Sequence, residues 1–240
     1  RSWWTPKILD VIVFSAPYDI RKLENALKHH FGNTKVGDCP KKFVIPIWDL
    51  FGMHRGERAS TVLMVNNFSG GVYEEYLDWP LYKVVAGSSA APTYFKPLIW
   101  QDSLGKKHMW TDGGQVDNTA LLSSLVTLFD KYFGAQIAPD DLAVLSFGNG
   151  YKFQFEDPDK KESWATPRML RSLINAIVQT NQLLGLTTSR RILFSNFRRC
   201  NFKLDLEPDL DDYRLIDKHI AWAKGCDLSE DKKWLKAFFV

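Results

Sequence analysis

A carboxylate followed by two glycines is the feature of this sequence with the clearest chemical use. Asp112-Gly113-Gly114 comes directly after an apolar stretch at 108–111, and Asn118 follows it before a helical pattern. A carboxylate at the end of a strand can act as a general base, and glycines beside it let backbone and substrate approach closely. Taken alone, the same three residues are also typical of a tight turn, in which glycines permit positive φ angles.

A base of this kind needs a nucleophile, and the sequence offers no clear one. Nucleophilic serines of acyl transfer often sit in a G-x-S-x-G turn. Only Gly87 has a serine two positions later, Ser89, and Ala91 stands where the second glycine is needed. We interpret Ser88 and Ser89 as small residues that pack at a helix end, while Ser69 fits a surface loop. A hydrolase that uses Ser89 by itself is the minor alternative.

Other chemical constellations are absent from the sequence. The histidines show no metal-ligand spacing with cysteines or carboxylates; they are His29, His30, His54, His108 and His219. Gly148-Asn149-Gly150 lacks the third glycine of a dinucleotide-binding loop, and no G-K-[ST] motif exists. The doublets Arg190-Arg191 and Arg198-Arg199 are typical of solvated surfaces, with contact to lipid head groups as the alternative. We therefore expect neither a metal nor an organic cofactor.

Composition limits the class of protein. A chain of 240 residues with 45% hydrophobic residues suits a single domain over 1–240. The formal charge of +3 comes from 31 basic and 28 acidic residues, which is too balanced to predict a nucleic-acid partner. The three cysteines form no C-x-x-C pair and indicate free thiols. No apolar run approaches the roughly 18–20 residues of a membrane span. Because Arg1-Ser2-Trp3-Trp4 resembles neither a signal peptide nor a Met start, we expect an internal start.

The elements that would position Asp112 can be read from periodicity and from breaker residues. In the first half we expect an apolar run at 5–16, a helix at 20–31 between Asp19 and Gly32, strands at 43–48 and 61–65, a helix near 80–90, and a hairpin over 97–110. The proline in the first of these strands indicates an edge or a bulge. The continuous apolar run at 61–65 predicts a strand covered on both faces.

The second half continues the alternation of helices and strands. Asn118 is expected to cap a helix that ends at Gly134. It is followed by a strand at 142–147, a charged loop at 152–163, a long helix from about Pro167, one or two strands within 191–206, and helices at 213–224 and 229–238. The alternation predicts an α/β fold with three layers, α/β/α, around a mainly parallel sheet.

Two motifs together resemble the second half of the patatin-like phospholipase domain. They are Ser89-Ala90-Ala91-Pro92-Thr93-Tyr94-Phe95 and, about twenty residues later, Asp112-Gly113-Gly114 with Asn118. The segments 18–38, 43–49 and 145–150 resemble further pieces of that family in the same order. The residues that flank Asn118 depart from the N-N-P that the family often has.

The resemblance implies a Ser/Asp dyad without histidine. Asp112 would be the general base, supported by Gly113, Gly114 and Asn118. The nucleophilic serine would lie upstream in a G-x-S-x-G segment that this sequence lacks, as it lacks the family's glycine-rich oxyanion loop. The chain then corresponds to the C-terminal portion of the domain, with its N-terminal elements missing, and is expected to be inactive by itself.

The complete protein would hydrolyse fatty-acyl esters of phospholipids or galactolipids, as a phospholipase A or lysophospholipase. The implied partners are a membrane lipid as substrate and the missing segment, or a second chain, that carries G-x-S-x-G; a homo-oligomer stays open. A cytoplasmic or peripheral membrane location follows from the same resemblance. The alternative is a catalytically silent subunit with the patatin fold and a structural or interaction role.

Overall fold

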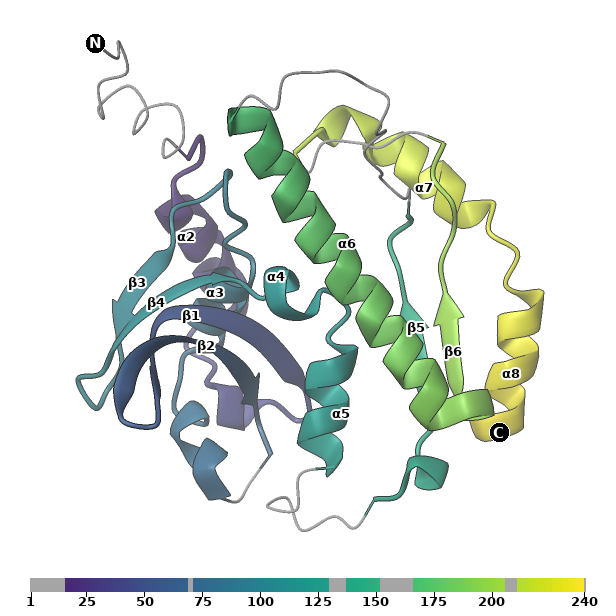
Figure 1. Cartoon of the computed structure of the whole chain (residues 1–240), viewed down its shortest axis with the longest axis horizontal. Coiled ribbons are helices and arrows are strands. Elements are labelled where there is room, and N and C mark those ends of the chain that lie inside the picture. Colours follow the sequence, from purple (N-terminus) through teal and green to yellow (C-terminus); the bar gives the residue numbers. More distant parts are fainter. Residues whose placement is uncertain (1–15, 69–70, 130–136, 152–165, 206–210, 240) are drawn as a thin grey trace. The chain divides into compact units, whose positions relative to one another are not determined.

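The computed structural model describes residues 16–68, 71–129, 137–151, 166–205 and 211–239 (Figure 1). Contacts within the chain divide it into two compact units. Unit 1 comprises Arg1–Gln136 and Ser163–Leu186, and unit 2 comprises Ile137–Glu162 and Thr187–Val240. Each unit is described by itself, and the single domain expected from the sequence stays a prediction. The apolar run expected at 5–16 lies outside the described residues except for its last residue, and so does the loop expected at 152–163.

Unit 1 contains a four-stranded sheet with the strand order β2-β1-β4-β3. Its strands are β1 (Val44–His54), β2 (Glu57–Asn66), β3 (Leu98–Gln101) and β4 (Lys107–Asp112). Arg55 and Gly56 join β1 to β2 with φ angles of 49° and 87°, as the favoured two-residue hairpin turn requires. The hairpin expected over 97–110 is confirmed as β3 and β4.

The expectation of a mainly parallel central sheet is wrong for these four strands. Every pair in this sheet is antiparallel, and the parallel pair of the described residues is β5 with β6 in unit 2. For the pairs β1–β2 and β3–β4, the physical reason is the length of the connections. A two-residue or five-residue link reverses the chain and can only form a hairpin, whereas a parallel neighbour needs a crossover of a dozen or more residues. The observed class is therefore mixed α/β.

The edge of the sheet also differs from the expectation. β2 is an edge strand, and its side chains alternate between exposed and partly buried, with Val62 48% exposed. The expected cover on both faces is therefore wrong for this strand. β1, which contains Pro46, lies inside the sheet, but its pairing with β4 begins only at Ile47, and its pairing with β2 shifts register between Asp49 and Gly52. The proline therefore marks the end of one ladder rather than an edge strand.

The helix expected at 20–31 is confirmed as α2 (Ile20–Phe31). Asp19 caps its first turn by accepting a hydrogen bond from Arg21 N–H (3.0 Å). Gly32 ends it with a φ of 59°, a conformation that glycine adopts without strain. Ile20 and Leu27 face the core of unit 1. The short helix η1 (Val36–Asp38) follows, and η2 (Gly71–Tyr76) comes after β2.

The second helix of unit 1, α3 (Leu81–Ser88), packs on the sheet and follows Pro80 as expected. Gly87 makes the close approach possible, because a Cβ there would lie 2.5 Å from the ring of Trp110. The fully buried centre of this core consists of apolar side chains from the sheet, from α3 and from η1: Val36, Ile47, Val65, Val84 and Trp110. The core therefore fixes β4, which carries Asp112 at its end.

The region after Asp112 differs from the expected single capped helix. A short helix, α4 (Gly114–Asp117), comes first, and Asn118 is its last, C-capping residue. The next helix, α5 (Leu121–Phe129), is capped by Asp117 instead, whose Oδ2 accepts a hydrogen bond from Ser123 N–H (2.7 Å). The expected capping role of Asn118 is therefore wrong, and the expected end at Gly134 lies outside the described residues.

The long helix expected from about Pro167 is confirmed as α6 (Thr166–Leu193), which runs from unit 1 into unit 2. Unit 2 contains the parallel pair β5 (Val144–Phe147) and β6 (Phe197–Cys200). It also contains the helices expected near the end of the chain, as shown by η6 (Tyr213–Leu215), α7 (Ile216–Lys224) and α8 (Ser229–Phe239). The short helices η4 (Pro139–Asp141) and η5 (Phe194–Asn196) precede β5 and β6.

Candidate active site

Asp112 is the last residue of β4, where it lies opposite Ile47 of β1. Its side chain is partly buried, and its Oδ1 accepts a hydrogen bond from Gly114 N–H (2.6 Å). Burial raises the pKa of the Asp112 carboxyl above its ordinary value, because loss of water disfavours the charged form more than the Gly114 bond favours it. Among the described residues, no Lys, Arg or His pairs with it. The group is thus a carboxylate poised to accept a proton.

Space is limited at the two glycines after Asp112, severely at Gly113 and slightly at Gly114. A Cβ on Gly113 would lie 1.8 Å from the carbonyl oxygen of Pro46, a backbone atom of β1. A Cβ on Gly114 would lie 3.1 Å from Asp112 Oδ1 and 3.0 Å from Asn118 Oδ1. Gly113 therefore lets the chain turn against β1 without displacing the carboxylate, whereas a side chain at Gly114 would need only small shifts of its neighbours.

The two motifs that the sequence separates by about twenty residues meet in the structure. Asp112 N–H donates to the carbonyl oxygen of Ala90 (3.2 Å), and Gly113 N–H donates to that of Ser88 (3.2 Å). The hydroxyl of Thr111 also donates to Ala90 O (3.0 Å). The segment that follows α3 therefore holds the end of β4, so its backbone helps to position Asp112.

The serines nearest to this turn do not have the geometry of a nucleophile elbow. Ser88 Oγ donates to the carbonyl oxygen of Pro46 (2.8 Å), which fits the expected packing role. Ser89 is exposed at the C-terminal end of α3 rather than packed. A nucleophile elbow lies between a strand and the helix that follows it, whereas Ser89 follows a helix. Ser69 lies outside the described residues.

The residue that caps α5 is Asp117, and not its neighbour Asn118 as expected. Asn118 is exposed, and its Oδ1 lies near the position of a Cβ on Gly114. Asp117 is buried, and its Oδ1 accepts a hydrogen bond from the Thr119 hydroxyl (3.2 Å) while its Oδ2 caps α5. Asp117 was not predicted from the sequence, because two adjacent residues are both good helix caps and only the course of the backbone decides which of them caps the helix.

Comparison with known proteins identifies the family of this chain. Residues 1–125, just over half of the chain, match the family model described as patatin-like phospholipase. The chain belongs to the patatin-like phospholipase family. It is 28% identical over 174 residues to a protein of Arabidopsis thaliana named "Probable inactive patatin-like protein 9". That match covers 69% of this chain and 43% of the relative, so the chain spans less than half of that protein's length.

This patatin-like chain also contains a buried charged cluster that the sequence analysis did not find. The His108 ring, fully buried, has Nδ1 3.0 Å from Asp49 Oδ2 and Nε2 3.3 Å from Asp102 Oδ2. A neutral imidazole donates from one ring nitrogen only, so the position of the ring proton decides which of the two carboxylates accepts from it. The only signal in the sequence was a histidine within an apolar strand, and its partners are 59 and 6 residues away.

The buried cluster is enclosed by aromatic rings. The centroids of the Trp79, Trp100 and Trp110 rings lie 5.1, 5.2 and 5.3 Å from that of His108. Such a setting holds the sheet together and keeps the cluster away from solvent. Among the described residues, no group of three or more His, Cys, Asp or Glu side chains suits a metal ion. In the same part of the chain, no helix has the length and apolar composition that crossing a bilayer demands.

Proposed function

We propose that the complete protein to which this chain belongs is a lipid acyl hydrolase in which Asp112 is the general base. The observation that carries the proposal is the state of the Asp112 carboxylate. It is partly buried, its pKa is raised, and no cation neutralises it among the described residues. A base works best when its pKa lies closer to the working pH than that of an exposed carboxylate.

The reaction needs a serine that this sequence does not supply in a suitable turn. We place that serine in a G-x-S-x-G segment, either in the same polypeptide before Arg1 or in a second chain. Its oxygen attacks the ester carbonyl while Asp112 takes its proton, and the proton then passes to the leaving alcohol. Water hydrolyses the acyl-serine by the same route in reverse. We also propose that the complete domain has the three layers expected from the family.

The substrate class follows from the family. Fatty-acyl esters of membrane lipids would present the carbonyl to the serine, and backbone N–H groups of the missing segment would stabilise the oxyanion. This scheme needs no metal and no organic cofactor. The 240-residue chain, tested alone, is expected to have no esterase activity, because covalent catalysis needs the serine.

A silent subunit with the patatin fold is the second candidate. The name of the Arabidopsis relative, which calls that protein probably inactive, favours it. The two candidates differ in one feature, which is whether a serine Oγ lies within about 2.6–3.2 Å of an Asp112 carboxylate oxygen in the complete protein. A structure of the complete protein decides between them.

Asp112→Asn in the complete protein tests the proposed base. Asparagine keeps the shape but cannot accept the proton, so hydrolysis of a nitrophenyl acyl ester should fall about 10²–10⁴-fold, the usual range for a general base. Asp140→Asn is the matched control, because Asp140 is exposed in unit 2. Near-normal turnover by the Asp112 variant would rule out the dyad.

A further inference from the structure

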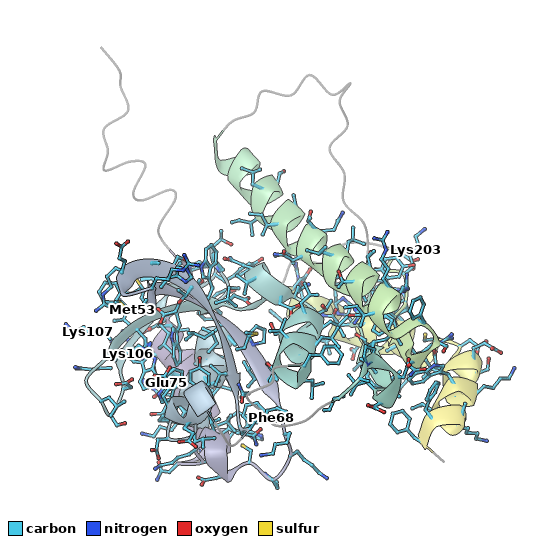
Figure 2. All side chains as sticks on the ribbon, turned by 60° about the horizontal axis from the view of Figure 1, so that its bottom comes forward. Met53, Phe68, Glu75, Lys106, Lys107 and Lys203 are labelled. Carbon is cyan, nitrogen blue, oxygen red and sulfur yellow. The ribbon has the colours of Figure 1, made fainter. Side chains whose placement is uncertain are left out.

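The turns of the two hairpins in unit 1 lie at the same end of the sheet. β4 runs antiparallel to β1, with Trp110 opposite Asp49 and Asp112 opposite Ile47. The start of β4 therefore lies beside the end of β1, so the β3–β4 turn adjoins the β1–β2 turn. Met53, His54 and Lys106 line one open hollow of about 590 Å³ between them. Figure 2 shows Met53, Lys106 and Lys107 together at this end, which we call the hairpin edge.

The hairpin edge exposes apolar side chains at positions where a turn is usually polar. Leu104 is 79% exposed in the β3–β4 turn. Met53 and Phe51, near the end of β1, are 44% and 40% exposed. None of the three contributes to the buried core of unit 1. These three side chains, on or near two adjacent turns, are separate exposed apolar groups rather than one wide patch.

Cationic side chains surround these apolar groups. Arg55, Arg58 and Lys107 are exposed, and none of them has a carboxylate oxygen within 4 Å among the described residues. The Arg58 guanidinium lies over the Phe51 ring, 4.0 Å from its centroid, which leaves the charge at the surface. Lys106 pairs with Glu75 (3.5 Å).

The negative charge near the hairpin edge is smaller. The exposed carboxylates that adjoin it are Glu57, the first residue of β2, and Glu75 of η2. Asp102 is buried and is held by His108. Four cationic side chains, Arg55, Arg58, Lys106 and Lys107, therefore outweigh two carboxylates at the surface.

We propose that the hairpin edge docks on an anionic phospholipid surface. Long cationic side chains place their charge at the level of the head groups, and apolar side chains beside them enter the boundary of the acyl chains. A protein partner would need an interface on the order of 1,000 Å² with a contiguous packed centre, whereas a bilayer accepts single side chains. Separate exposed apolar side chains among cations, of which Arg55, Arg58 and Lys107 have no carboxylate partner among the described residues, therefore fit the bilayer better.

The hairpin edge is separate from the proposed base. It lies at the start of β4, and Asp112 lies at the end of that strand, six residues long. At roughly 3.3 Å per residue, the two are about 17 Å apart along the strand. Binding to a lipid surface can therefore be measured without any hydrolysis, and its failure would leave the Asp112 proposal untouched.

Vesicle flotation of the protein that contains this chain tests the docking surface. With phosphatidylcholine vesicles containing 30% phosphatidylserine, we expect binding that weakens as salt is raised, and much weaker binding to pure phosphatidylcholine. Arg55→Gln together with Lys107→Gln should weaken binding about 25-fold, on the order of fivefold for each cation. Leu104→Ser should weaken it about tenfold through the lost apolar insertion.

Two matched variants in unit 2 control for charge and apolarity alone. Lys203→Gln removes an exposed cation, and Phe147→Ser removes a side chain that is 71% exposed. Both should bind vesicles like the parent, and circular dichroism should show that all variants are folded. The proposal is overturned if the folded parent does not bind the anionic vesicles, or if the hairpin-edge variants bind as tightly as the controls. Capture of a protein partner by this edge without vesicle binding would also overturn it.

Discussion

Removal of the buried imidazole, by His108→Leu, should destabilise unit 1 strongly. In the parent, the Oδ1 atoms of Asp49 and Asp102 accept hydrogen bonds from backbone N–H groups, whereas each Oδ2 is bonded to His108. The leucine variant keeps the backbone bonds and leaves both Oδ2 atoms buried without a donor. Breaking a buried charged pair by removal of one partner costs about 3–5 kcal/mol.

The magnitude can be tested within a cycle of variants. Urea-induced unfolding at pH 7, followed by tryptophan fluorescence, should show a loss of about 3–5 kcal/mol for His108→Leu. The same substitution in a background of Asp49→Asn and Asp102→Asn should cost clearly less, because no charge is left unpaired. The exposed His29→Leu serves as the control, with a change within about 0.5 kcal/mol.

The contribution of the two carboxylates to the stability of the fold depends on pH with a definite sign. Burial acts to raise the pKa of Asp49 and of Asp102, but hydrogen bonds from His108 and from backbone N–H groups outweigh burial, so both pKa values lie below 3.8. Their stabilising contribution is therefore fully present above the ordinary pKa of an aspartate and is lost as the pH falls through the lowered values. In the parent, the stabilising contribution of these two carboxylates should not change between pH 7 and pH 5.

The leucine variant should behave in the opposite way. Without the imidazole, one of the hydrogen bonds that lower the pKa of each carboxyl is lost, so both carboxylates take up protons more readily. The stability difference between His108→Leu and the triple variant that also carries both asparagines should therefore shrink from pH 7 to pH 5. A loss below about 1 kcal/mol at pH 7, or an equal loss in the asparagine background, would refute the role of His108 as the bridge between the two carboxylates.

Two further substitutions test the turn around Asp112. Ser89→Ala should change the free energy of unfolding by about 1 kcal/mol or less and leave hydrolysis by the complete protein unchanged, because Ser89 is exposed at a helix end; labelling of Ser89 by a fluorophosphonate probe would contradict this. Gly113→Ala should lower stability by about 1–3 kcal/mol and also reduce hydrolysis, because its Cβ would lie 1.8 Å from Pro46 O and would displace Asp112. Unchanged unfolding and turnover would show that the backbone of β1 yields freely at this point.

Local signals in the sequence predicted the elements well, and the pairing of strands poorly. The cap Asp19, the terminator Gly32 and the turn at 102–106 act over a few residues, and the elements they delimit are confirmed. Strand direction depends on which strands become neighbours. The helix α3 lies between β2 and β3, which suggested a parallel crossover, but these two strands occupy opposite edges of the sheet. No local pattern distinguishes these outcomes.

In the candidate site, too, local features were predictable from the sequence and contacts between distant residues were not. A short motif was sufficient to single out Asp112 and the two glycines, because the steric demand on Gly113 arises within a single turn and its neighbour strand. The Asp49–His108–Asp102 cluster was not predictable, since its members belong to different strands and a turn and meet only after the sheet has formed. Asp117 was missed because its capping role depends on the short helix α4 before it.

The presence of Asp-Gly-Gly does not by itself separate an enzyme from a silent subunit, because Gly113 has a steric role against β1 that is independent of catalysis. Substitution of Asp112 provides a test that separates them. The described structural role of the Asp112 side chain is to accept one hydrogen bond from Gly114 N–H, which an asparagine oxygen would accept equally well. Because burial raises the pKa of Asp112, the charged form lowers the stability of the fold at neutral pH, where the unfolded chain ionises more readily.

Asp112→Asn should therefore keep or increase the free energy of unfolding at pH 7 while hydrolysis by the complete protein is lost. The stabilising effect should fade as the pH falls towards the ordinary pKa of an aspartate, since the parent then carries a neutral carboxyl as well. Urea titrations of parent and variant at pH 7 and pH 4.5 measure both points. A variant that is less stable at pH 7 and still hydrolyses the ester would mean that Asp112 serves the fold, and the silent subunit would become the better assignment.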